Sequence, residues 1–193
     1  MLETYAKQPT PMIFPGGDCA ACVVSTALNY CGISKDVKES HEILKGESGI
    51  YKSLFRDVSD ALKKFKGVKL IDYDHTFPPV IYSPWSEHAC AQGFKFNPSK
   101  YFEKIKYYVD NDFIALIPVS ELDTSRYAQT DHWIIIDSYR IEKTENSKNL
   151  SNPVTIKNYF RIVCSKNGIY EMEVLDFIKN KGGAVQIFIK PIS

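Results

Sequence analysis

The fold is decided by residues 16–33, which read Gly-Gly-Asp-Cys-Ala-Ala-Cys-Val-Val-Ser-Thr-Ala-Leu-Asn-Tyr-Cys-Gly-Ile. Apolar and small residues recur at helical spacing after Cys19, which predicts a helix over 19–31. Asp18 can cap the first turn of this helix, and Gly32 can end it. Because the helix is apolar over most of its surface, we expect it to be central and buried.

Cys19 lies where a glycine-containing loop enters this helix. The backbone N–H groups and the positive end of a helix favour the thiolate over the thiol, and the thiolate is the reactive form. The charge of Asp18 would oppose thiolate formation unless it is solvated. Cys19 is therefore the candidate nucleophile, and such a thiol requires a histidine base, which we expect far downstream on a strand.

His132 is the candidate base, because it begins the apolar run His-Trp-Ile-Ile-Ile-Asp directly after a polar loop. This run predicts a strand, so the imidazole can lie at a sheet edge that faces the nucleophile helix. The other histidines fit less well. We expect His41 on a charged, exposed helix, while His75 and His88 lie in segments without a clear period.

The remaining pattern predicts helices first and an antiparallel sheet afterwards, which is an α+β domain. We expect one domain over residues 1–193, with loops at 74–97 and 120–131 and a polar connection at 141–153. The other expected elements are helices at 36–46, 53–66, 98–109 and 175–179, strands at 68–73, 113–119, 132–139, 154–164 and 184–189, and a turn at 167–168.

Composition excludes several classes of function. Lys and Arg number 24 and Asp and Glu number 23, so the chain lacks the excess of positive charge that a nucleic-acid-binding surface needs. No apolar run is long enough to predict a membrane span. The N-terminus has no apolar signal core, which favours a cytoplasmic location, although signal-independent export would leave no trace in the sequence.

The 5 cysteines do not form a recognisable disulfide framework, because they are odd in number and the chain has no signal peptide. Cys19-x-x-Cys22 has no second ligand pair of the kind that zinc sites use. We therefore expect no metal and no organic cofactor. Cys22 and Cys31 are expected to be small buried helix residues.

The run Asp18-Cys19, followed by Asn29-Tyr30-x-Gly32, resembles the nucleophile helix of the papain-like cysteine peptidases. The likeness is nearest to the bacteriocin-leader peptidases, whose motif is Asp-Cys-Gly, an apolar helix and Asn-Tyr-x-Gly. This spacing selects Cys19. Papain's own motif has its nucleophile at the second cysteine of a CxxC, which keeps Cys22 as an alternative. Related bacterial effector deamidases also carry a CxxC in this helix.

The strand that begins at His132 is similar to the base-bearing strand of the same peptidases, and residues 101–118 resemble the helix and strand that precede it. The resemblance implies a papain-like fold with an active-site cleft between helices and sheet. It also implies a cysteine-dependent hydrolase of a peptide or amide bond in a peptide or protein substrate. Two alternatives stay open: an acyltransferase or transglutaminase-like enzyme with the same Cys–His pair, and a catalytically silent domain that binds a protein partner.

The oxyanion site departs from the family pattern. These peptidases have a glutamine about six residues before the nucleophile that donates to the oxyanion, and this chain has Ile13 or Phe14 there. Gln8 is the nearest glutamine. Ala20 replaces the usual glycine after the cysteine.

The residue that orients the histidine is also ambiguous. Papain-like enzymes place an Asn or Asp just before a glycine-containing turn, which selects Asn167 and, as a second choice, Ser165. Asp137 ranks lower, because its odd spacing from His132 puts it on the opposite face of a strand. The predicted catalytic set is therefore Cys19, His132 and Asn167.

Overall fold

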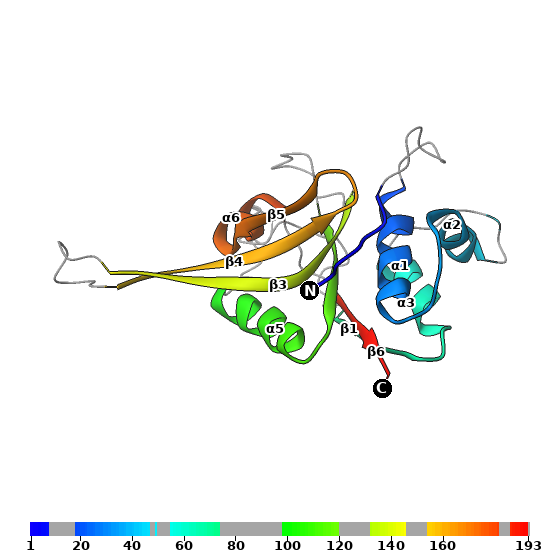
Figure 1. Cartoon of the computed structure of the whole chain (residues 1–193), viewed down its shortest axis with the longest axis horizontal. Coiled ribbons are helices and arrows are strands. Elements are labelled where there is room, and N and C mark those ends of the chain that lie inside the picture. Colours follow the sequence, from blue (N-terminus) through cyan, green and yellow to red (C-terminus); the bar gives the residue numbers. More distant parts are fainter. Residues whose placement is uncertain are drawn as a thin grey trace, which may run out of the picture.

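A computed structural model describes residues 1–7, 18–46, 49, 55–73, 98–119, 132–145, 154–181 and 186–192. Among these residues, three helices come first and lie together at one end of the molecule (Figure 1). They are α1 (Cys19–Tyr30), α2 (Val37–Lys45) and α3 (Phe55–Lys63). Helix α1 is the most buried of them, since every residue from Cys19 to Leu28 is inaccessible to solvent or nearly so.

A six-stranded antiparallel sheet in the order β1-β6-β2-β3-β4-β5 forms the centre of the molecule. Two further helices, α5 (Pro98–Asp110) and α6 (Val174–Lys181), pack against this sheet. The strands are β1 (Val68–Tyr73), β2 (Ile114–Val119), β3 (His132–Glu145), β4 (Val154–Cys164), β5 (Gly168–Glu173) and β6 (Gln186–Pro191).

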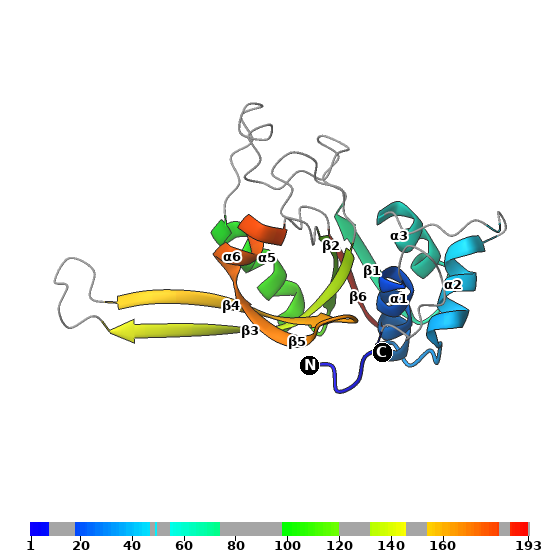
Figure 2. The same ribbon diagram turned by 90° about the horizontal axis from the view of Figure 1, so that it is seen from above.

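The sheet separates two apolar cores, and α1–α3 contact one face while α5 and α6 contact the other (Figure 2). Successive side chains of β3 point alternately into the two cores. Trp133 and Ile135 join the core that contains α1, and Ile134 and Ile136 join the core that contains α5. This two-residue period explains why β2 and the first part of β3 are buried on both faces.

The predicted order of helices followed by an antiparallel sheet is confirmed. Helices were correctly placed at α1, α2, α3 and α5, and the predicted apolar face of α5 is buried at Tyr101, Phe102, Ile105 and Tyr108. None of the described helices has both the length and the apolar character needed to cross a bilayer.

Two parts of the sheet were predicted wrongly. Strand β5 was missed, because Gly168–Glu173 alternates only weakly and is half-exposed along its length. Strand β3 continues to Glu145, through residues predicted to belong to the polar connection at 141–153. There it pairs with the start of β4 as a two-stranded ribbon that leaves the body of the molecule (Figures 1 and 2). Both faces of this ribbon are exposed to solvent, so its sequence lacks the alternation of apolar and polar residues that predicts a half-buried strand.

Candidate active site

The side chain of Asp18 sits at the start of α1 but does not cap it. The residue occupies the N-cap position, and its carbonyl oxygen accepts a hydrogen bond from the backbone N–H of Cys22 at 2.8 Å. Its carboxylate makes no capping bond and instead lies 2.6 Å from Nε2 of His41. The predicted side-chain cap was therefore wrong, because the carboxylate turns to a stronger partner.

His41 lies in the interior, with 0% of its surface exposed, so its predicted exposure on a charged helix was wrong. Helix α2 presents Ser40, His41 and Leu44 to the interior as one stripe. A hydrogen bond between Nε2 of His41 and Oδ1 of Asp18 joins the two buried side chains. Burying a carboxylate is costly unless it is paired, and this contact lets Asp18 stand fully buried beside Cys19.

The thiols of Cys22 and Cys31 are poor nucleophiles at neutral pH. Burial, the charge of Asp18 and the neighbouring Cys19 raise the pKa of Cys22 to about 12. Burial also raises the pKa of Cys31 to about 11. Both thiols therefore remain protonated near pH 7. Cys22 is buried in α1 as predicted, but Cys31 follows the helix at its C-cap and is half-buried, so its predicted burial within the helix was wrong.

His132 is the first residue of β3, and it is buried with 5% of its surface exposed. Its Nε2 lies 3.2 Å from the Sγ of Cys164, the last residue of β4. Since β3 and β4 are antiparallel, the end of one lies beside the start of the other. The same sulfur accepts a hydrogen bond from the backbone N–H of Asn167 at 3.2 Å.

The three candidates for orienting His132 make their contacts elsewhere. Asn167 contributes its backbone N–H to Cys164, and its side chain is exposed. Ser165 is buried, and its hydroxyl has no hydrogen-bond partner among the described residues. Among the described residues, neither of these two nor Asp137 is hydrogen-bonded to His132. Asn167 as a catalytic residue stays a prediction.

Asp137 instead belongs to a clamp on the N-terminal segment. Its Oδ2 accepts a hydrogen bond from the backbone N–H of Leu2 at 2.6 Å and another from Nη1 of Arg161. Further along, the N–H of Ala6 donates to the hydroxyl of Thr26 on α1 at 2.9 Å. Residues 1–7 thus run from β3 and β4 to α1, as Figure 1 shows in dark blue. The sequence offered no signal for this clamp, because nothing in the N-terminal residues indicates a partner on β3.

Helix α1 packs on strand β3, and this packing brings the two halves of the candidate site together. Trp133, which follows His132, shares an apolar core with Cys19. Cys164 contacts His132 from the end of the neighbouring strand β4. The start of β3 and the helix that begins at Cys19 therefore meet across this core.

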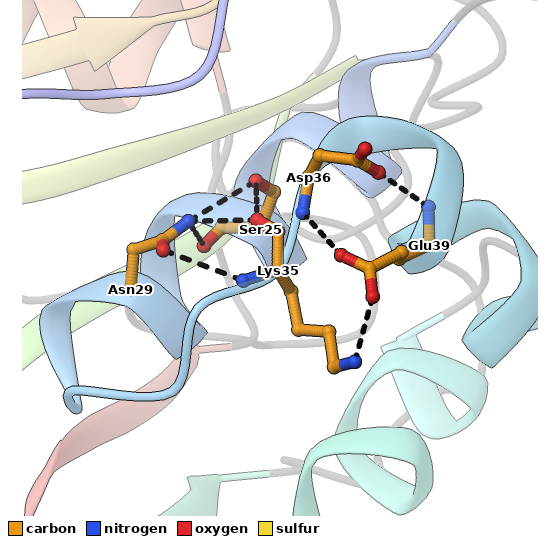
Figure 3. Close-up of polar contacts among 5 residues, drawn as sticks. All are labelled: Ser25, Asn29, Lys35, Asp36 and Glu39. Atoms are coloured by element: carbon orange, nitrogen blue, oxygen red, sulfur yellow. Dashed lines mark hydrogen bonds and ion pairs between the residues drawn. The ribbon is translucent and has the colours of Figure 1, made fainter.

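The Asn-Tyr-x-Gly motif has a structural role at the far end of α1. The side-chain amide of Asn29 donates to the carbonyl oxygens of Ser25 and Lys35, each at 2.8 Å, which fixes the short link to α2 (Figure 3). The hydroxyl of Tyr30 donates to the carbonyl oxygen of Asp112 at 2.6 Å, in the turn between α5 and β2. Gly32 adopts a positive φ of 77°, which glycine tolerates without strain.

Helix α2 begins with a capping box. Asp36 Oδ1 accepts from the backbone N–H of Glu39 at 2.7 Å, and Glu39 Oε2 accepts from the backbone N–H of Asp36 at 2.9 Å (Figure 3). Lys35 also pairs with Glu39 at 2.8 Å. These contacts fix the start of the helix that carries His41, so they help to place the partner of Asp18.

Several residues that the sequence analysis weighs lie outside the described residues. They are Gln8, Ile13, Phe14, His75 and His88, together with the predicted loops at 74–97 and 120–131. Within the part of the chain that the structure describes, no three His, Cys, Asp or Glu side chains are grouped so that they could hold a metal ion.

No family model matches the sequence, and no curated protein matches it. Among solved structures, the fold is similar to a double-glycine-motif protease from an AMS/PCAT transporter, crystallised in complex with the leader peptide. The TM-score is 0.51 at 13% identity, and the match covers 100% of this chain and 97% of that chain. The chain therefore has the papain-like α+β fold that its nucleophile helix predicted. At this identity the likeness shows the fold alone, so the peptidase activity and the link to the effector deamidases both stay predictions.

Proposed function

We propose that this chain is a papain-like cysteine hydrolase that cleaves a peptide or amide bond, with Cys19 as nucleophile and His132 as base. The observation that carries the proposal is the packing of α1 on β3, which puts Cys19 and Trp133, the residue after His132, in one apolar core. The fold likeness to a protease adds support.

The chemistry needs only the groups of the chain and a water molecule. His132 takes the proton of the Cys19 thiol, and the thiolate attacks the substrate carbonyl carbon to form a tetrahedral adduct. The protonated His132 returns this proton to the leaving amine as the C–N bond breaks, which leaves a thioester on Cys19. Water, deprotonated by His132, then releases the acid and restores the thiol. The backbone N–H of Cys19, at the positive end of α1, is the available oxyanion donor.

The substrate we propose is an extended peptide. The similar solved structure holds a leader peptide and carries the name of a double-glycine-motif protease. The first substrates to test are therefore synthetic peptides with a Gly-Gly pair before the scissile bond. Matched peptides with Ala-Ala at the same place are the control for sequence preference.

The test is cleavage of these peptides by the full chain, followed by mass spectrometry. We expect Cys19→Ala to abolish cleavage, and brief acid quenching of the wild type to trap a substrate acyl group on Cys19. The matched control is Cys31→Ala, which removes a thiol outside the site and should retain full activity. An acyl group found on Cys22, or activity that survives in Cys19→Ala, would contradict the assignment.

Thiol labelling provides a second test that needs no substrate. We expect iodoacetamide at pH 6–7 to modify Cys19 faster than the other thiols, and Cys22 to be among the slowest, because its pKa lies near 12. Labelling of Cys19 that is no faster than that of Cys22 in the folded protein would favour the catalytically silent alternative. If the acyl group is trapped on Cys19 but passes to an added amine instead of water, the chain is an acyltransferase.

A further inference from the structure

We infer that Cys164 is the positioning residue for His132. Its thiol takes the place of the carboxylate or carboxamide that ordinarily orients such a base. The inference rests on the proposed function, because it concerns how the base is held. Neither the predicted catalytic set nor the similar fold assigns a role to this cysteine. It follows from which ring nitrogen the structure engages.

The imidazole of His132 has two nitrogens, and the contact with Cys164 uses Nε2 at 3.2 Å. The inference gives the proton of the neutral ring to Nε2, which donates it to the sulfur. In this tautomer the lone pair that can take a proton is on Nδ1. The contact with Cys164 would then set both the orientation of the ring and the atom that acts as base.

The sulfur is itself held in place. Cys164 has only 1% of its surface exposed and ends β4, where its Sγ accepts the backbone N–H of Asn167 at 3.2 Å. That bond closes the turn to β5, which Gly168 enters with a φ of 82°. A side chain at Gly168 would be strained by this backbone conformation, so the glycine supports the turn that directs the N–H to the sulfur.

The chemistry of sulfur makes this positioning weak. A thiol is a poor hydrogen-bond acceptor and carries no formal charge, whereas a carboxylate forms charge-assisted bonds that are roughly twice as strong. Cys164 therefore orients the ring while stabilising the imidazolium little.

The test compares Cys164→Ala, Cys164→Asn and Cys164→Asp with Cys31→Ala as a matched thiol control. We expect Cys164→Ala to lower kcat about 10- to 100-fold with KM within about twofold, as loss of a positioning partner does. Asn should restore most of kcat. Asp should move the acidic limb of the kcat/KM profile upward by about one pH unit, because a neighbouring negative charge raises the pKa of an imidazolium.

A measurement on the resting protein separates this inference from the proposed function. In Cys19→Ala, which is inactive in either case, nitrogen NMR of His132 should show the proton on Nε2, and addition of Cys164→Ala should change this tautomer population. If Cys19→Ala loses activity but substitution of Cys164 changes neither the tautomer nor kcat, the positioning role is overturned and the proposed hydrolase activity is not. If substitution of Cys164 changes the tautomer but activity does not depend on Cys19, the proposed hydrolase activity is overturned and the positioning role is not.

Two further outcomes would overturn the inference. An acyl group trapped on Cys164 would make it a nucleophile, and Nε2 that is unprotonated in the wild type would show that the ring does not donate to the sulfur. If Cys164→Ala fails to fold, the tautomer in the wild type and the pH profile of the nearly isosteric Cys164→Ser still decide the question. We expect this variant to retain the Nε2 proton.

Discussion

Two buried histidines in this chain have different kinds of partner. His41 on α2 is completely buried and lies 2.6 Å from the carboxylate of Asp18. His132 begins β3 and lies 3.2 Å from the thiol of Cys164. The short contact of His41 with a fully buried carboxyl group suits a structural role, because it holds α2 against the start of α1. The contact of His132 is with a thiol, which is a weaker hydrogen-bonding partner than a carboxylate.

The largest expected effect comes from His132→Ala. We expect kcat to fall about 10³-fold, which is the middle of the range for loss of a general base, while the melting temperature changes by only a few degrees. Peptide cleavage and thermal unfolding measured on the same preparation check this expectation. If the variant unfolds in proportion to its loss of activity, His132 is structural and the contrast with His41 disappears.

His41→Ala should have the opposite profile. It leaves the fully buried carboxylate of Asp18 without this partner, so we expect the free energy of unfolding to fall by about 3 kcal/mol in urea titrations. The matched control is Glu42→Ala, the next residue on α2, whose side chain is 61% exposed in its pair with Lys45 and whose loss should leave the urea midpoint nearly unchanged. A loss of under about 1 kcal/mol in His41→Ala would contradict a structural pair.

A double-mutant cycle tests how much of this free energy of unfolding comes from the contact between Asp18 and His41. Asp18→Asn and His41→Ala, alone and combined, should give a coupling energy of about 2 kcal/mol, within the range for residues in direct contact. The same Asp18→Asn variant removes a charge that raises the pKa of Cys22, so this thiol should react faster with iodoacetamide above pH 8. Additive effects in the cycle would show that the two residues act independently.

The smallest expected effect comes from the start of α2. Asp36→Ala removes half of the capping box and should cost about 1 kcal/mol of stability. Lys38→Ala, an exposed change in the same first turn, is the control and should be nearly neutral. Because α2 carries His41, a loss as large as that of His41→Ala would mean that the helix itself, and not the buried pair, dominates the stability of this end.

The parts of the fold that were predicted correctly are those with a strong local period. Helix α1 is apolar throughout, α5 has a clear stripe, and β2 is a buried apolar run, so each element is specified by its own residues. Strand β5 and the distal part of β3 were missed, because their alternation is weak and their stability comes from pairing with β4.

The site was predictable only in part, for the same reason. Cys19 is the first residue of a helix and His132 the first residue of a strand, and both positions follow from the local sequence pattern and from the family resemblance. The burial of His41 was not predictable, because α2 is rich in charge and its partner Asp18 is 23 residues away in the sequence. Cys164 could have been found only from the register of β3 and β4, which places the end of one beside the start of the other.

The sequence by itself determined the helix that presents Cys19, the strand that begins at His132, and the order of helices before sheet, because these depend on periodicity and on residues close together in the chain. Only the tertiary structure decided that Asp18 pairs with His41, that Asp137 clamps the N-terminal segment, and that Cys164 is the neighbour of His132. Each of these contacts joins residues far apart in sequence. Their partners are chosen by burial and by strand register, which a single sequence does not display.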